Sequence, residues 1–124
     1  MRTFRIGTRE IGGDAPPLIV AEVGFNHNGD VGLAKQMTLA AAECGCDAVK
    51  FQAFRGPELF APGFTEKKPD GSEWRPAEFY ARYELADEAY AELAQTCAER
   101  RILFLCTPFD LGAVAMLERL NVPA

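Results

Sequence analysis

Short, nearly continuous runs of apolar residues recur along the chain, and each is followed by a segment with helical spacing. The runs cover residues 18–23, 48–52 and 102–106. Each has the length of a strand, and strands that are apolar on both faces are typical of a parallel sheet covered by helices. Alternating strands and helices also favour right-handed βαβ connections. The pattern therefore predicts an α/β fold with three βα units within residues 18–120.

The helices that should follow these strands have clear start signals. Asp30 and Asp110 are good N-caps for the first and third helices, and Gly45 is a good terminator of the first. The second helix should cover 86–100. The apolar faces predicted from the spacing are Leu33, Met37, Ala40 and Cys44 in the first helix, Ala86, Ala89, Leu93 and Cys97 in the second, and Val114, Leu117 and Leu120 in the third.

Two segments depart from the strand–helix alternation. Residues 1–13 contain two short alternating runs around Gly7 and Thr8, which predict a β-hairpin. Residues 53–84 are rich in Pro and Gly and predict a long irregular loop, a kind of segment that often serves as a functional lid. We expect the aromatic residues of this loop to pack within the lid rather than to contact a substrate: Trp74, Tyr80 and Tyr83.

Composition narrows the class of protein. The 124 residues suit one domain, with 48% apolar and 25% charged residues. The net charge of −5 argues against a nucleic-acid surface. No apolar run reaches the ~20 residues of a membrane span, and the first residues do not resemble a signal peptide, so we expect a cytoplasmic protein. Four cysteines and one histidine do not have zinc-site spacing, and we expect the cysteines to be small residues of a reduced core.

Polar residues interrupt the predicted strands near their carboxyl ends. These residues are Glu22 in the first strand, Lys50 and Gln52 in the second, and Thr107 at the end of the third. Central parallel strands seldom carry such residues without a reason, because burying an unpaired charge is costly. In a (β/α) barrel the active site forms at the carboxyl ends of the strands. We therefore predict that these four side chains face one common centre.

Simpler interpretations of the same residues are open. Glu22 and Lys50 could form a buried ion pair that only neutralises itself. Gln52 and Thr107 could be strand ends that reach solvent. His27 is expected to be a hydrogen-bonding loop residue rather than a metal ligand, because the chain offers it no partners.

The loop after the first strand and the region beyond the second strand carry other polar residues. Asn26 and Asn28 suit turn formation. Arg55 and Arg75 could recruit anions, but we expect them to be solvated surface charges.

Three motifs together resemble the N-terminal part of the sialic acid synthase family, which includes N-acetylneuraminate synthase and its legionaminate and pseudaminate relatives. The motifs are AEVGFNHNGD at residues 21–30, DAVKFQ at 47–52 and FLCTPFD at 104–110. They occur in the right order and are separated by the same long loop, so the resemblance covers nearly the whole chain. The predicted hairpin also resembles the one that closes the bottom of that family's barrel.

The resemblance implies a (β/α)8 TIM barrel that condenses phosphoenolpyruvate with an N-acyl-hexosamine such as N-acetylmannosamine. A divalent metal, Mn²⁺ or Mg²⁺, activates the aldehyde in that family. By motif, Lys50 resembles a phosphoenolpyruvate-binding lysine and Thr107 a hydroxyl donor to its phosphate. Gln52 resembles a contact to a sugar hydroxyl, and Glu22 resembles a catalytic carboxylate near the aldehyde and the attacking water.

The resemblance also implies that residues 1–124 are only the first three βα units of such a barrel. The family's metal-binding histidines, a second phosphate-binding lysine, the remaining units and a C-terminal antifreeze-like domain all lie beyond position 124. We therefore expect no metal ligands in this chain, little or no synthase activity from it alone, and self-association through exposed sheet edges.

Two other functions are compatible with the residues. One is a Schiff-base aldolase on the same barrel, with Lys50 as the nucleophile. The other is a non-catalytic, shortened paralogue that binds a sugar or a partner protein.

Overall fold

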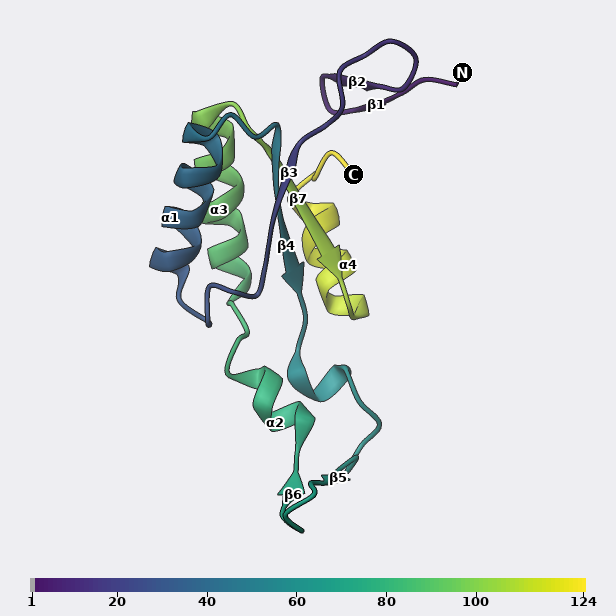
Figure 1. Ribbon diagram of the computed structural model, residues 1–124, viewed down its shortest axis with the longest axis vertical. Coiled ribbons are helices and arrows are strands. Elements are labelled where there is room, and N and C mark those ends of the chain that lie inside the picture. Colours follow the sequence, from purple (N-terminus) through teal and green to yellow (C-terminus); the bar gives the residue numbers. More distant parts are fainter. Residues whose placement is uncertain (1) are drawn as a thin grey trace.

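A three-stranded parallel sheet with the order β3–β4–β7 forms the centre of the molecule (Figure 1). The computed structural model describes residues 2–124. The strands are β3 (Val20–Gly24), β4 (Ala48–Ala53) and β7 (Leu103–Pro108). The longer helices are α1 (Val31–Glu43), α3 (Asp87–Arg100) and α4 (Leu111–Arg119). The prediction of an α/β fold with a parallel sheet is confirmed.

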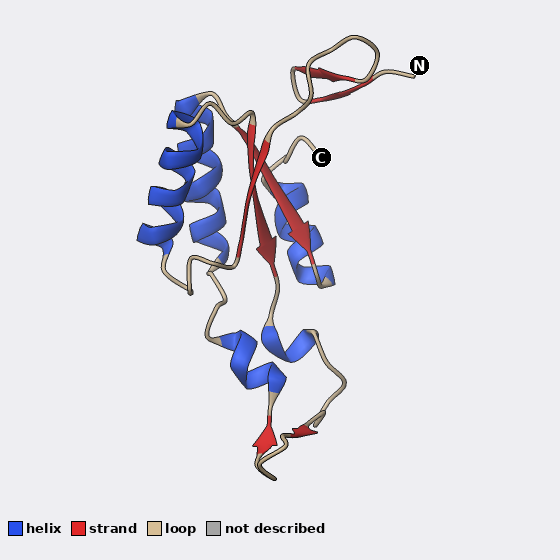
Figure 2. Ribbon diagram, viewed as in Figure 1, coloured by secondary structure: helices blue, strands red, loops and turns tan. Residues whose placement is uncertain are grey.

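The helices pack against one face of this sheet. Side chains of Val49, Phe51 and Phe104 from this face belong to the same buried cluster as Leu93 of α3 and Met116 of α4. Helices α1 and α3 lie side by side, as Figure 2 shows, and α1 adds small residues to the cluster. The hydrophobic core therefore lies between the helices and only one side of the strands.

The buried side of α1 differs from the predicted one. Ala34, Thr38 and Ala41 are buried, whereas Ala40 and Cys44 of the predicted face are exposed. The spacing was recognised, but the face was wrong by about one residue. The small residues Ala34, Thr38 and Ala41 lie where α1 meets the core, and Met37 of the predicted face also packs against the core, partly buried.

The other two helices follow the predicted faces more closely. In α3, Ala89, Leu93 and Cys97 are buried as predicted, and Ala86 is the exposed N-cap residue. In α4 the predicted Leu117 is buried, but Val114 is 39% exposed. The buried neighbours of Leu117 are Ala113 and Met116.

The cysteines do not share one environment. Cys97 and Cys106 are buried, and this burial raises the pKa of each thiol to about 12. These two are the small core residues that the sequence predicted. Cys44 is exposed, so that prediction was wrong there, because the residue lies on the solvent side at the end of α1.

The predicted N-terminal hairpin is confirmed. Strands β1 (Phe4–Ile6) and β2 (Arg9–Ile11) pair antiparallel. They lie at the amino end of the parallel sheet, where both chain termini are also found (Figure 1). Gly7 in the turn has a φ of +57°, and a Cβ there would lie 3.2 Å from Leu103 Cδ2. The hairpin turn therefore packs against the start of β7.

The segment at 53–84 contains more regular structure than predicted. It includes a 3₁₀ helix, η1 (Gly56–Glu58), a small hairpin of β5 (Glu66–Lys67) and β6 (Glu73–Trp74), and a short helix, α2 (Pro76–Ala81). Proline at the first turn of η1 and of α2 supplies a preset φ, so prolines that suggested a loop begin short helices here. The segment extends from the carboxyl end of the sheet, at the bottom of Figure 1.

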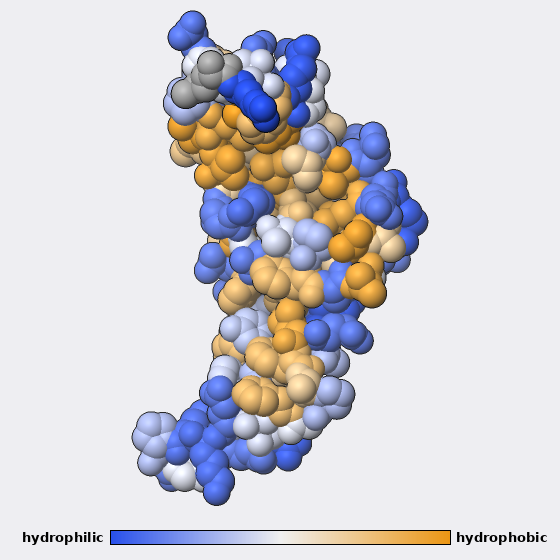
Figure 3. Space-filling view, turned by 90° about the vertical axis from the view of Figure 1, so that its right-hand side faces the viewer, coloured by the Kyte–Doolittle hydropathy of each residue, from blue (hydrophilic) through white to orange (hydrophobic). Residues whose placement is uncertain are grey.

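Large apolar side chains also remain on the surface. Figure 3 shows apolar atoms gathered along the middle of one side of the molecule, with hydrophilic atoms at both ends. Among residues 2–124, the exposed large apolar side chains are those of Phe4, Ile19, Val20, Phe64, Phe109, Leu111 and Val114. Within residues 2–124, no helix combines the length and the apolar character needed to cross a bilayer.

Candidate functional site

Glu22 and Lys50 meet on the sheet face that the helices leave uncovered. They are register partners on the neighbouring parallel strands β3 and β4, so their side chains leave the sheet on the same side. The Nζ atom of Lys50 lies 2.8 Å from Oε2 of Glu22. The Lys50 side chain is 38% exposed and the Glu22 side chain is 47% exposed. The ion pair exists, but the interpretation as a buried pair is wrong because this face is open.

Gln52 and Thr107 lie one pleat further along the same face. They are register partners on β4 and β7, and both are partly buried. Gly24, at a φ of +58°, lies where β3 bulges, and a Cβ there would be 3.7 Å from Oε1 of Glu22 and 3.8 Å from Cδ of Gln52. The structure thus brings an acid, an amine, an amide and a hydroxyl together at the carboxyl ends of three strands.

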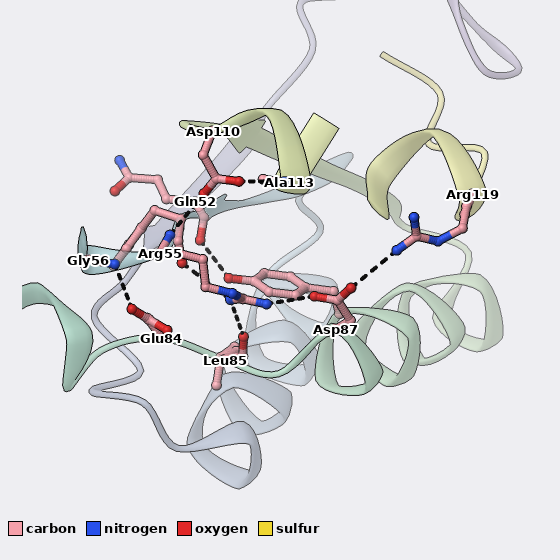
Figure 4. Close-up of polar contacts among 11 residues, drawn as sticks. Gln52, Arg55, Gly56, Glu84, Leu85, Asp87, Asp110, Ala113 and Arg119 are labelled. Carbon is pink, nitrogen blue, oxygen red and sulfur yellow. Dashed lines mark hydrogen bonds and ion pairs between the residues drawn. The ribbon is translucent and has the colours of Figure 1, made fainter. Parts of the chain in front are cut away.

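A network of hydrogen bonds holds the end of β4 in place (Figure 4). The backbone N–H of Arg55 donates to Oδ2 of Asp110 at 2.9 Å, and Oδ1 of Asp110 accepts from Ala113 N at 2.7 Å. The hydroxyl of Tyr90 donates to the backbone carbonyl of Gln52 at 3.0 Å, while the Gln52 amide extends away from it. This network joins β4 to the starts of α3 and α4 and so fixes where Gln52 stands.

The side chain of Arg55 is 40% exposed, in keeping with the predicted surface charge, but its guanidinium is also bonded to neighbouring residues. Its guanidinium donates to the carbonyl of Leu85 at 2.9 Å and to Oδ1 of Asp87 at 2.7 Å. Asp87 also pairs with Arg119, at 3.2 Å. Arg75 does remain on the surface, where it bonds to acidic neighbours.

His27 is fully buried and behaves as the predicted loop hydrogen-bonder. Its Nδ1 accepts a hydrogen bond from Gly29 N at 3.1 Å. Burial lowers the pKa of His27, and Asp30 opposes that shift only in part. Asn28 takes a left-handed φ of 54°, and the Asn26 side chain donates to the carbonyl of Val23, so both serve the turn.

No group of three His, Cys, Asp or Glu side chains that could hold a metal ion occurs in the part of the chain that the structure describes. The single histidine of the chain, His27, accepts a hydrogen bond at Nδ1 within its own loop, and its buried Nε2 has no hydrogen-bond partner. The described residues therefore do not form a metal site by themselves.

An aromatic pocket next to Gln52 was missed by the sequence reasoning. The pocket has a volume of about 240 Å³. Besides Gln52, its lining consists of Phe25, Phe54, Leu59, Phe60, Tyr80 and Phe109. The signal in the sequence is that phenylalanines directly follow the strand ends: Phe25 follows β3, Phe54 follows β4 and Phe109 follows β7. Tyr80 packs among these rings, as expected of the lid, and also lines the pocket.

Comparisons with known proteins show which proteins this chain is similar to. A family model described as the NeuB family matches residues 37–124. N-acetylneuraminate-9-phosphate synthase from Mus musculus is 37% identical over 121 residues, which cover 93% of this chain and 33% of the mouse protein. N,N'-diacetyllegionaminic acid synthase from Campylobacter jejuni is 36% identical over 109 residues, which cover 85% of this chain and 33% of that protein.

The fold is similar to that of a solved structure. N-acetylneuraminic acid synthetase from Leptospira borgpetersenii, solved in complex with citrate, matches with a TM-score of 0.82 and 30% identity. The match covers 98% of this chain and 39% of that protein. The chain thus spans about a third of the length of the curated relatives that it matches.

Proposed function

The chain belongs to the NeuB family, and we propose that it forms the first part of the barrel of a nonulosonic acid synthase, a TIM-barrel enzyme that condenses phosphoenolpyruvate with an N-acyl-hexosamine such as N-acetylmannosamine. The observation that carries the proposal is the group formed by Glu22, Lys50, Gln52 and Thr107 on the open face of the sheet. In a barrel this face is the interior, and its carboxyl end is where substrates bind.

The group has complementary chemistry for these two substrates. Phosphoenolpyruvate is highly anionic, and a lysine ammonium with a neutral hydroxyl donor suits its phosphate, so Lys50 and Thr107 are assigned to it. The amide of Gln52 is assigned to a sugar hydroxyl. Glu22 is assigned to orient the aldehyde and to accept a proton from the attacking water.

The reaction requires a bond from C3 of phosphoenolpyruvate to the aldehyde carbon, addition of water at C2, and loss of phosphate by C–O cleavage. A carboxylate helps the water step because it removes the proton as the new C–O bond forms. In the structure, the Glu22 carboxylate is paired with the Lys50 ammonium. A bound substrate phosphate would compete for this ammonium and so free the carboxylate of Glu22. The chain's own residues are assigned no step through a metal, since in this proposal the metal ligands lie outside residues 1–124.

The proposal includes parts that this chain does not supply. The remaining βα units, a C-terminal antifreeze-like domain and the metal ligands would come from outside residues 1–124, and a homo-oligomer would cover the exposed strands. The chain alone is then expected to be inactive, because the barrel interior has other walls that must position the sugar.

The test is phosphate release that depends on both substrates. A polypeptide that continues this chain through a full barrel should release phosphate from phosphoenolpyruvate only when N-acetylmannosamine or a related N-acyl sugar and Mn²⁺ are present. The Glu22→Gln variant should lower turnover about 10²- to 10⁴-fold. Glu43→Gln, at the exposed end of α1, is the control and should leave turnover unchanged. Equal turnover in both variants would refute the role of Glu22.

One experiment distinguishes the proposed synthase from a Schiff-base aldolase. A nucleophilic lysine must be a neutral amine, whereas Lys50 is ion-paired with Glu22 at 2.8 Å. Borohydride treatment with pyruvate should therefore leave the mass of the protein unchanged. A reduced adduct on Lys50 would support the aldolase function instead.

A further inference from the structure

We propose that the aromatic pocket beside Gln52 receives a methyl group of the acceptor sugar and that the acceptor carries no phosphate at this position; this inference rests on the proposed function. The one-carbon apolar group could be the methyl of the N-acyl substituent or the C6 methyl of a 6-deoxy sugar. Both have the same chemistry, and the experiment below distinguishes them.

The pocket is continuous with the candidate site. The Gln52 side chain lines the pocket and also lies over Gly24 beside the Glu22 carboxylate. A sugar whose hydroxyl binds the Gln52 amide therefore has its neighbouring substituents at the mouth of the pocket. A volume of about 240 Å³ holds part of a sugar, not a whole disaccharide.

The rings that form the pocket support one another. Phe25 packs edge-on against Phe54, with ring centroids 5.9 Å apart, and against Tyr80 at 5.7 Å. Phe60 stacks on Tyr80 at 5.8 Å, and Phe109 meets Phe54 edge-on at 6.5 Å. These mutual contacts keep the walls in place, so the pocket is preformed and favours an apolar group over a hydrated one.

The surroundings do not suit a second phosphate. None of the pocket-lining residues is charged. Arg55 is held by Leu85 and Asp87, and Arg82 lies over the ring of Phe79 at 5.7 Å from its centroid. Lys50 is assigned to phosphoenolpyruvate. A phosphate placed in the pocket would thus lose water without gaining a cation.

Saturation-transfer NMR on the chain tests this contact without any need for turnover. The probes are N-acetylmannosamine, its 6-deoxy analogue and its 6-phosphate. We expect one methyl signal to receive the strongest saturation: the N-acetyl methyl in both neutral sugars, or the C6 methyl in the 6-deoxy sugar. If the C6 methyl occupies the pocket, the 6-deoxy sugar should bind about fourfold more tightly than N-acetylmannosamine, which is the effect of burying one methyl group. The 6-phosphate should bind more weakly than either neutral sugar.

Two variants locate the contact in the pocket. Phe109 is 48% exposed, so Phe109→Ala removes one wall of the pocket without opening the core. It should abolish the preferential saturation of the methyl group. Leu111→Ala is the control, because Leu111 is 87% exposed nearby in the chain and does not line the pocket. Phe60→Lys should introduce the missing cation and strengthen binding of the 6-phosphate severalfold.

The outcomes separate this inference from the proposed function. Methyl saturation that is absent, or that is equal in the Phe109→Ala and control proteins, overturns the inference, even when the full barrel releases phosphate. Tighter binding of the 6-phosphate by the unmodified chain also overturns it. Lack of phosphoenolpyruvate-dependent turnover together with selective methyl saturation refutes the proposed function and leaves the pocket as a sugar-methyl site.

Discussion

Glu22 and Lys50 are held together by the register of two neighbouring strands, on a surface that is still partly wet. Exposed ion pairs contribute only about 0–1 kcal/mol to stability, because water screens the charges and ordering long side chains costs entropy. Side chains that are 38% and 47% exposed fall in this class. At the residue scale, the pair is therefore better explained by binding than by folding.

Lys50→Met separates these two roles. The free energy of unfolding should change by less than about 1 kcal/mol. In the full barrel, phosphoenolpyruvate-dependent turnover should fall about 10²- to 10³-fold, the size of effect seen when one electrostatic contact to a transition state is removed. The matched control is Lys35→Met. Lys35 of α1 pairs with Glu92 of α3 at 2.5 Å, so this lysine also loses an exposed ion pair but lies outside the candidate site. A loss of turnover in both variants would contradict the assignment of Lys50.

His27 should make stability depend on pH. Its lowered pKa means that the unfolded chain, with a pKa near 6.5, binds the proton more readily than the folded chain. The contribution of His27 is complete above pH 6.5 and is lost as the pH falls through the lowered pKa of the folded state, because burial disfavours the charged imidazolium. Denaturation between pH 7 and 5 should show a slope of at most about 1.4 kcal/mol per pH unit. In His27→Asn this slope should disappear; a slope that persists would mean that other groups cause it.

Among the elements, the starts of α1 and α4 are capped in the same way but are tied differently to the rest of the molecule. Asp30 accepts from Leu33 N, and Asp110 accepts from Ala113 N. Only Asp110 also accepts a bond from another element, the backbone N–H of Arg55 after β4. Helix α4 and the end of β4 therefore depend on a shared carboxylate.

Comparing Asp110→Ala with Asp30→Ala tests this difference. Asp30→Ala should lower the free energy of unfolding by about 1 kcal/mol, the usual value of an N-cap. Asp110→Ala should cost about 1–3 kcal/mol more, because the N–H of Arg55 loses its acceptor in a partly buried place. Urea denaturation of the two variants measures both values. Equal losses would show that the bond to Arg55 contributes nothing.

For the molecule as a whole, the main physical feature is a sheet with one covered and one open face. In the part of the chain that the structure describes, β3 and β7 are outer strands, each with one side that has no neighbouring strand. Ile19 and Val20, at the start of β3, are 52% and 37% exposed. Open strand edges beside apolar surface favour pairing with another chain.

Self-association should therefore increase with concentration. Sedimentation velocity of the chain should show a weight-average mass above 13.6 kDa that rises with protein concentration. Val20→Lys should reduce this rise, because a charge at the edge strand opposes pairing. Phe64→Lys, in the segment beyond the sheet, is the control and should have little effect. A single monomeric species at every concentration would contradict this prediction.

The amino-acid sequence alone was enough to predict the parallel α/β class, the hairpin and the shared face of Glu22, Lys50, Gln52 and Thr107. The reason is that these features follow from local rules: apolar runs of strand length, capping residues such as Asp30 and Asp110, and the strict alternation of side chains along a strand. The motifs around the same residues indicated the family.

Only the tertiary structure decided which side of α1 is buried, what Arg55 bonds to, and that rings from five separate points of the chain form one pocket. Leu33 and Ala34 differ by one position on a helix, and the choice between them depends on how closely the neighbouring helix can approach. Likewise, Phe25, Phe60 and Phe109 are far apart in the sequence and line one pocket only because the segment after β4 starts at the carboxyl ends of the strands. Such contacts depend on distances between elements, and no local pattern records those distances.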